Sequence, residues 1–262
     1  MKNAIIFILW FILSYILQMI PFVENVNKCF VRKICILEDE RVSKFAVKNM
    51  KCNICGRINE VTYLAMGSQQ GGPDLDFRPA EVRRSAMPLW IRKCDYCRNV
   101  FSTSEEMPEY EEKYIDSKEY VNCGNIAGLP ELSKRFVKIA LIYKHCKEYK
   151  KAGDHFLYAA WACDDAGLDP IAIVCRKRAL KYYNEVNGSK LAKRELPDFM
   201  LCILDIMRRS GMYDEVIAFA DNCELEDPKD QAICEFQVQK AKERDKKRYC
   251  VEDVLQDVAK NK

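Results

Sequence analysis

Two closely spaced pairs of cysteines are the residues of this 262-residue chain that point most directly to chemistry. Two residues separate Cys52 from Cys55 and Cys94 from Cys97, and residues 56–93 lie between the pairs. A tight turn of this kind presents two thiolates to one ion, and two such turns complete the tetrahedral shell of four sulfurs that zinc accepts. The spacing therefore predicts a closed, structural Zn²⁺ site with Cys52, Cys55, Cys94 and Cys97 as ligands.

Two other roles for these cysteines stay open from the sequence. An iron ion in the same four-sulfur cage would form an electron-transfer centre, although nothing in the sequence indicates an electron-transfer partner. A dithiol redox pair usually opens a helix of a βαβ unit, and that setting is absent around both pairs. The interval between the pairs exceeds the roughly 15–20 residues of a common zinc ribbon, so we expect the intervening segment to form an excursion from the ribbon.

The composition of the chain excludes several other classes of protein. Hydrophobic residues make up 49% and charged residues 31%, which is typical of a folded chain and not of a disordered one. The two histidines, His145 and His155, lie in helical patterns and offer little material for catalytic triads or imidazole acid–base chemistry. Most of the 14 cysteines lie singly in amphipathic patterns, which favours a reducing compartment. We therefore expect a protein that is not an enzyme.

An acidic pair, Asp74 and Asp76, is the weakest candidate for catalysis or for binding a second metal. Residues two apart in a loop can share an ion, but no base, nucleophile or open metal site lies near them in the sequence. We favour the interpretation that the pair orders its loop through turn hydrogen bonds and ion pairs with Arg78.

Short strands are the elements expected to position the cysteines. The breaker cluster Gly71-Gly72-Pro73 interrupts residues 50–128, and the apolar runs at 61–64 and 89–91 have the length of strands. Acidic residues and tyrosines recur over residues 105–119, which is typical of a solvated connecting segment. We expect residues 50–128 to form a small β-rich zinc ribbon with an acidic connector.

Residues 129–257 carry the periodicity of amphipathic helices. Phe136, Ile139, Ala140 and Tyr143 fall on one face of a first helix, and a second helix repeats the design around Phe156. Breakers such as Asn187-Gly188 and Ser210-Gly211 separate further helices, which are predicted at 171–186, 198–209, 214–222 and 229–246. Short connections make neighbouring helices antiparallel.

The first two of these helices match a 34-residue repeat of helical hairpins. The match begins at Ser133, a looser one begins at Pro197, and the stretch between them carries a degenerate unit at best. These units resemble tetratricopeptide repeats, which stack into a scaffold whose groove binds a protein or peptide. A plain helical bundle with the same spacing stays open as the alternative.

The N-terminal residues 1–49 form a hydrophobic extension. No charged residue occurs from Asn3 to Val23, and about 20 helical residues cross the roughly 30 Å hydrocarbon layer of a bilayer, so residues 4–23 are predicted to form a transmembrane helix. The positive charges after this stretch favour a single-pass membrane protein with a cytoplasmic body. A cleaved signal peptide is a competing interpretation, although the residues after the apolar stretch lack a small-x-small cleavage pattern. Another alternative is a mispredicted start: a chain beginning at Met50 would keep the whole folded part and would be cytoplasmic.

Basic residues gather around the second cysteine pair and raise an alternative function. With Trp90 and Phe77 among them, they have the composition of a nucleic-acid-binding zinc ribbon. Acidic residues share the region, so we favour a salt-bridged surface. The six cations are Arg78, Arg83, Arg84, Arg92, Lys93 and Arg98.

Four motifs follow one another along the chain: Met50 to Gly56, Asp74-Leu75-Asp76-Phe77-Arg78-Pro79, Pro88-Leu89-Trp90 and Cys94-Asp95-Tyr96-Cys97. In this order they resemble the opening of a bacterial family known as domain of unknown function 2225. The resemblance covers roughly residues 50–250 and implies a zinc ribbon joined to tetratricopeptide-like helices, with no established activity. Arg98 departs from the family, which often has a glycine there, and residues 1–49 have no counterpart in it.

The sequence thus predicts a mainly α protein, with an N-terminal hydrophobic helix, a small zinc ribbon and a tetratricopeptide-like domain. The function that we expect is a non-enzymatic scaffold for protein–protein interaction, stabilised by zinc. The alternative is nucleic-acid binding through the arginines of the ribbon.

Overall fold

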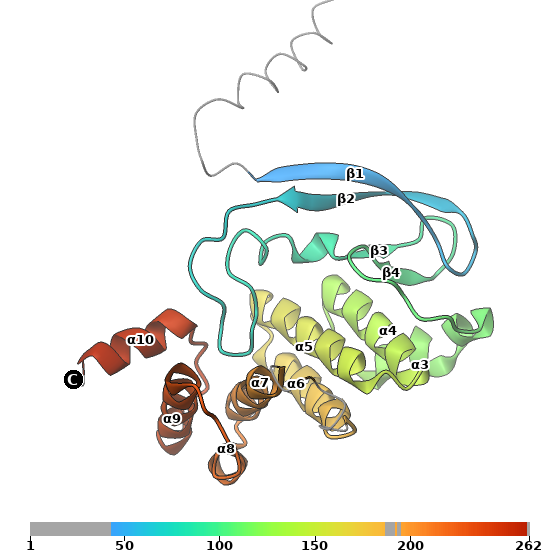
Figure 1. Ribbon diagram of the computed structural model, residues 1–262. Helices are drawn as coiled ribbons and strands as arrows, with labels where there is room; N and C mark the ends of the chain where they lie inside the picture. The colour runs from blue at the N-terminus through green and yellow to red at the C-terminus, as the bar shows by residue number, and fades with distance from the viewer. Residues whose placement is uncertain (1–42, 187–191, 193–194, 261–262) are drawn as a thin grey trace, which may run out of the picture. The chain divides into compact units, whose positions relative to one another are not determined.

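Two small antiparallel sheets precede eight α-helices in the computed structural model, which describes residues 43–186, 192 and 195–260 (Figure 1). The expected order, a β-rich part followed by a helical part, is therefore confirmed. The helix predicted at 4–23 lies outside the described residues. In the described part of the chain, none of the helices has both the length and the apolar character needed to cross a membrane.

Each sheet is a two-stranded hairpin. Strand β1 (Lys44–Lys51) pairs with β2 (Ile58–Met66), and β3 (Ile91–Lys93) pairs with β4 (Val100–Ser102). Lys51 lies opposite Ile58, and Ile91 lies opposite Ser102. Strand β1 begins before Met50, so a chain that started at Met50 would lack most of this strand. The expectation that such a chain would keep the whole folded part is therefore wrong.

The helices follow the predicted order closely. One difference concerns the helix predicted at 229–246, which ends at Lys242 and is followed, after a break, by a separate helix. At the break Arg244 adopts a left-handed conformation, and the Asp245 N–H donates to the Lys240 carbonyl. The helices are α3 (Lys118–Val121), α4 (Glu131–His145), α5 (Tyr149–Asp165), α6 (Asp169–Tyr183), α7 (Leu196–Arg209), α8 (Tyr213–Ala220), α9 (Pro228–Lys242) and α10 (Val251–Lys260).

Three helix-to-helix loops share one backbone design. Lys147, Gly167 and Gly211 occupy the middle of the loops that follow α4, α5 and α7, and all three have a left-handed φ of 61°, 67° and 76°. In each loop the next residue donates its N–H to a carbonyl five positions back, which is the hydrogen bond of a Schellman motif. Glycine adopts this φ without strain, whereas Lys147 does so at a cost.

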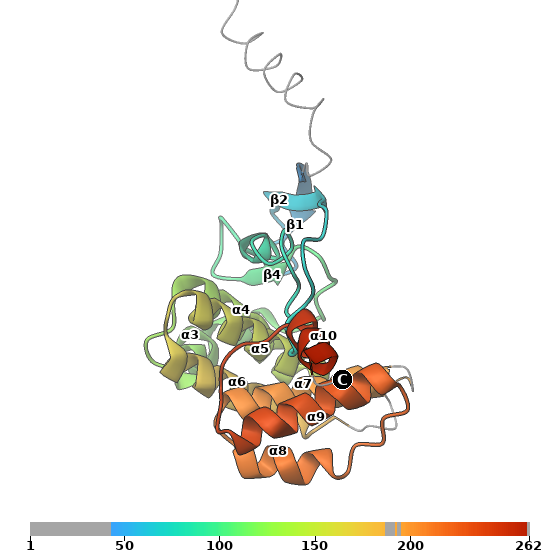
Figure 2. The same cartoon turned by 90° about the vertical axis from the view of Figure 1, so that its left-hand side faces the viewer.

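Close packing joins α5 to its neighbour α6. A Cβ atom added at Gly153 on α5 would lie 2.4 Å from the Tyr183 ring on α6, so only glycine fits at this contact. The rings of Phe156 and Tyr182 stack beside it with centroids 5.4 Å apart. Figure 2 shows α7, α8 and α9 side by side, and these three helices also contact one another directly.

The β-rich part and the helices share one hydrophobic core. Strands β3 and β4 contact α4, and the Trp90 ring meets Phe136 of α4 and Tyr158 of α5 edge-on at 6.5 and 5.6 Å. Ile91 and Val100 are buried in the same cluster as the central residues of α4 to α6. The position of the second cysteine pair is therefore tied to the helical scaffold.

Candidate metal centre and the adjoining cavities

The two cysteine pairs occupy the turns of the two hairpins. Cys52 and Cys55 lie between β1 and β2, and Cys94 and Cys97 lie between β3 and β4. The first cysteine of each turn donates its backbone N–H across the hairpin, Cys52 to the Arg57 carbonyl and Cys94 to the Asn99 carbonyl, both at 2.9 Å. The turns thereby place the four thiols at one point. Within the described residues, this is the one group of cysteine, histidine and acidic side chains arranged to hold a metal ion.

The sulfur positions fit a tetrahedral ion. All four Sγ atoms lie within 4.8 Å of one another, with Cys52 to Cys97 at 3.8 Å and Cys55 to Cys94 at 3.6 Å. Zinc–sulfur bonds of about 2.3 Å in a regular tetrahedron require sulfur–sulfur distances of about 3.8 Å, whereas a disulfide bond is about 2.05 Å long. The four thiols are free and can hold a metal ion, which would supply folding free energy and leave no open coordination position.

Two buried asparagines cross-link the cysteine turns. The Asn59 side-chain amide donates to the Cys94 sulfur at 3.6 Å, and the Asn99 amide donates to the Cys52 sulfur at 3.5 Å. Both side chains are at most 1% exposed, and each is held by further hydrogen bonds, Asn59 from the Asp95 N–H and Asn99 from the Tyr110 hydroxyl. Sequence reasoning missed them. The available signal was an asparagine that follows the second cysteine of each pair by a few residues, at the beginning of the returning strand in Asn59 and directly before it in Asn99.

The thiols differ in how readily they ionise. Burial raises the pKa of Cys94, but the backbone N–H groups of Tyr96 and Cys97 outweigh it and lower that pKa to about 6. Burial raises the pKa of Cys97 to about 12. Four adjacent thiolates repel one another, and this repulsion opposes ionisation of all four thiols. A bound divalent cation offsets the repulsion with its positive charge.

The Asp74–Pro79 loop is pinned to the helices by separate ion pairs. Asp76 accepts from the Trp161 indole at 2.7 Å and pairs with Arg209 of α7 at 3.3 Å. Arg78 pairs at 2.5 Å with an aspartate, Asp165 of α5. The expected ion pairs between the acidic pair and Arg78 are therefore absent from the described contacts, although the Arg78 N–H does donate to Asp76 at 3.4 Å. Asp76 pairs with Arg209, whereas Asp74 pairs with Arg84. Because each aspartate has its own arginine partner, the two do not form a shared ion site.

Most of the cations around the second cysteine pair have a carboxylate partner. Arg84 pairs with Asp74 at 2.6 Å, and Arg92 donates to both oxygens of Asp95 at 2.7 Å. Arg98 also has a carboxylate partner, as does Arg78. Four of the six cations are thus already paired, which favours a salt-bridged surface over a phosphate-binding one.

The buried histidine has no free ring nitrogen. Nε2 of His155 lies 3.0 Å from Glu105, and Nδ1 lies 3.0 Å from the Lys151 carbonyl oxygen. Burial raises the pKa of Glu105, but the hydrogen bond and charge of His155 outweigh it and leave this pKa below its ordinary value. Both ring nitrogens are therefore engaged in holding the structure.

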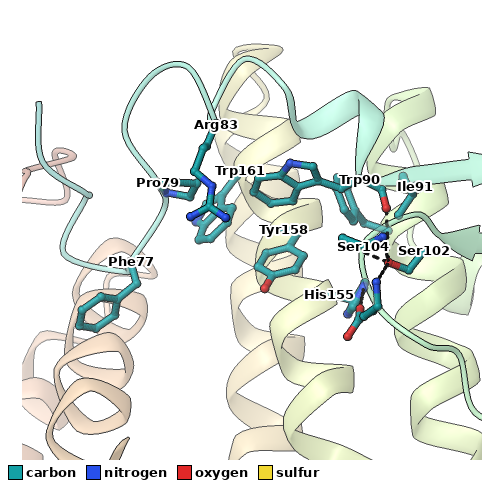
Figure 3. A pocket seen from close by; sticks show the side chains of 12 residues that line it. Phe77, Pro79, Arg83, Trp90, Ile91, Ser102, Ser104, His155, Tyr158 and Trp161 are labelled. Carbon is teal, nitrogen blue, oxygen red and sulfur yellow. Dashed lines mark hydrogen bonds and ion pairs between the residues drawn. The ribbon is translucent and has the colours of Figure 1, made fainter. Parts of the chain in front are cut away.

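Two cavities lie between the Asp74–Pro79 loop and the helices, and the β3–β4 hairpin lines the first of them. The first has a volume of about 390 Å³, and Figure 3 shows Arg83 above it, with Tyr158 and Trp161 between Phe77 and Trp90. The second has a volume of about 340 Å³ and reaches α7. Both cavities are lined by Phe77, Tyr158 and Trp161, so they adjoin one another.

Comparisons with family models, with curated proteins and with solved structures found no match to this chain. The assignment of a function therefore rests on the residues themselves. Of these, the four cysteines predicted as ligands lie together in the structure.

Proposed function

We propose that this chain is a non-enzymatic scaffold for protein–protein interaction, stabilised by a zinc ion on Cys52, Cys55, Cys94 and Cys97. The observation that carries the proposal is the approach of four free thiols, from two hairpin turns, to distances suited to a tetrahedral ion. Four sulfur ligands complete the coordination of zinc, so the ion would stabilise the fold and would not bind a substrate.

The scaffold role is supported by how the helices already hold a segment of their own chain. The Asp74–Pro79 loop lies against α5 and α7 through the ion pairs of Asp76 and Arg78 and the indole of Trp161. The helices thus bind an irregular segment through buried charges and aromatic rings. Tetratricopeptide-like stacking would provide further surface of the same kind for a partner protein or peptide.

The proposal includes two further expectations from the sequence. The motif order of the domain of unknown function 2225 family, a ribbon followed by tetratricopeptide-like helices, agrees with this assignment. Residues 4–23 would anchor the scaffold in a membrane, with its body in the cytoplasm.

The first experiment measures metal in the full chain, purified in detergent without added metal. We expect about one zinc per chain, and we expect Cys94→Ser to lose both the zinc and the cooperative thermal unfolding of the parent. Cys146→Ser is the matched control, because Cys146 is a half-buried free thiol outside the cluster. Iron in the parent, or no metal with a reversible disulfide between Cys52 and Cys55, would contradict the zinc assignment.

The scaffold role is tested by cross-linking the full chain in an extract of its native cells. We expect proteins to be captured, with cross-links that map to α4 through α9 and that depend on zinc. Capture of nucleic acid in a salt-sensitive manner, without protein, would instead support the alternative function.

A further inference from the structure

The two adjoining cavities form one cleft, the aromatic cleft, whose walls include seven aromatic residues. Phe77, Tyr158 and Trp161 line both halves, Trp90 and Phe136 line the first half, and the second adds Tyr183 and Phe199. Figure 3 shows Phe77 at one end and Trp90 at the other, with Tyr158 and Trp161 between them. Such walls favour proline and other apolar side chains of extended peptides, and also the flat or charged heads of basic side chains.

Charge differs between the two halves of the aromatic cleft. The second half is lined by four carboxylates against one lysine, Lys150. Asp76 pairs with Arg209 and Asp154 with Lys150, whereas Glu195 and Asp198 have no cation partner among the described residues. The first half has Arg83 at its rim, which also lacks an ion pair in the described part of the chain. Its one carboxylate, Glu105, lies 3.0 Å from Nε2 of the buried His155.

Phe77 is held at the mouth of the cleft in an exposed position. Its side chain is 37% exposed and its φ is 60°, a left-handed conformation that is costly for a bulky residue. The neighbours Asp76 and Arg78 are anchored by their ion pairs to α7 and α5, so the loop presents the ring on a fixed base. An exposed aromatic ring held in this way costs stability, which is typical of a residue that serves binding.

We propose that the aromatic cleft binds an extended peptide segment of a partner protein, with a lysine or arginine side chain in the acidic half and an apolar side chain in the half that contains Trp90. This inference rests on the proposed scaffold function and names the site and the chemistry of the partner. Glu195 and Asp198, which have no cation partner among the described residues, attract the basic side chain, and the rings of Phe77 and Phe199 provide faces for its cation. Arg83 repels a basic residue from the other half and so favours the apolar side chain there.

The charge of the cleft disfavours a nucleic acid as the occupant. A phosphate backbone approaching Glu195 and Asp198 meets like charge, and the described residues of the acidic half offer one lysine against them. A small free cation would use the acidic half alone. An extended peptide uses both halves, because they adjoin through Phe77, Tyr158 and Trp161.

The test titrates the full chain in detergent with pools of blocked nonapeptides that lack Trp and Tyr. One pool has arginine fixed at the centre and the other has glutamate. The chain has three tryptophans, and two of them, Trp90 and Trp161, line the cleft, so their fluorescence reports occupancy. We expect the arginine pool to bind at least about tenfold more tightly than the glutamate pool.

Two pairs of variants locate the binding. We expect Phe77→Ala and Asp198→Asn each to weaken binding of the arginine pool by about threefold to tenfold. Phe45→Ala and Asp214→Asn are the matched controls, because Phe45 is an exposed ring on β1 and Asp214 is an acidic residue in the first turn of α8, as Asp198 is in α7. Neither control should change binding.

Several outcomes would overturn this inference. Equal binding of both pools, or unchanged binding in Phe77→Ala and Asp198→Asn, would remove the cleft as the site. Tetramethylammonium that bound as tightly as the arginine pool would make it a small-cation site, and a single-stranded oligonucleotide displaced by the peptides would make it a nucleic-acid site. If the chain retains zinc and captures a partner while the cleft variants have no effect, the inference fails and the proposed function stands.

Discussion

Replacing Asn59 with aspartate tests whether the cysteine cluster holds charged, metal-bound sulfurs. The substitution keeps the size of the side chain and its acceptor for the Asp95 N–H, which lies 2.9 Å away. It removes the amide donor to the Cys94 sulfur and places a carboxylate about 3.6 Å from that sulfur instead. The variant Asn59→Asp therefore changes charge and hydrogen bonding at the cluster with little change in packing.

The size of the effect follows from this distance. Two unit charges 3.6 Å apart repel by about 4–5 kcal/mol at an effective dielectric constant of about 20. A zinc ion with four thiolates carries two net negative charges over four sulfurs, so repulsion from the nearest sulfur is about 2 kcal/mol. The lost hydrogen bond to a charged sulfur adds about 1 kcal/mol. We therefore expect zinc affinity to fall by about 3 kcal/mol, or roughly a hundredfold.

Competition with a chelator of known zinc affinity, at neutral pH, measures this loss in the full chain. Asn49→Asp is the matched control, because it adds the same charge at an exposed position of β1 and should leave zinc affinity within about threefold of the parent. If Asn59→Asp bound zinc as tightly as the parent, the Asn59 amide would not be contacting a charged sulfur, and the reasoning about the cluster would be refuted.

Three predictions concern the stability of the helical part, measured by urea unfolding. Gly153→Ala places a methyl group against the Tyr183 ring and should destabilise the fold by about 2 kcal/mol; an unchanged midpoint would contradict the close packing. Lys147→Gly replaces a residue in a left-handed conformation and should stabilise the fold by about 0.5 kcal/mol, whereas Gly167→Ala should destabilise it by about 1 kcal/mol. If both substitutions changed the free energy of unfolding in the same direction, the shared loop design would be refuted. Burial raises the pKa of Asp164, but two arginines outweigh it and hold this pKa below its ordinary 3.8. Its ion pairs should therefore stabilise the fold above this pH and be lost as pH falls through the lowered value, and Asp164→Asn should reduce this acid-dependent loss.

The local order of the fold could be read from the sequence because it depends on short-range signals. Periodicity identified the helices from Glu131 to Lys242, although not the separate last helix α10, and paired cysteines identified the turns that carry the candidate metal ligands. Breakers such as Ser210-Gly211 located loops because glycine adopts the left-handed conformation readily. The same rule does not identify Lys147, which occupies an equivalent position without being glycine.

Features that depend on tertiary contact could not be read in this way. Asn59 lies far from Cys94 in the sequence, and only the approach of two hairpin turns brings the amide to the sulfur. Arg78 lies two residues from Asp76, yet its carboxylate partner is Asp165 on α5. Sequence proximity favoured the wrong ion pair because it contains no information on how the loop folds over the helices.

The candidate metal site and the aromatic cleft lie at opposite ends of the same β3–β4 hairpin. Cys94 and Cys97 form its turn, whereas Trp90 and Ser102, at the other end, line the cleft. The Thr103 N–H donates to the Trp90 carbonyl at 2.8 Å and closes this end of the hairpin. Since each strand has three residues, pairing along the hairpin depends on constraint from both ends. A metal ion at the turn would thus hold in place one wall of a cleft that it does not touch, and removing the metal should weaken peptide binding even in a chain whose helices stay folded.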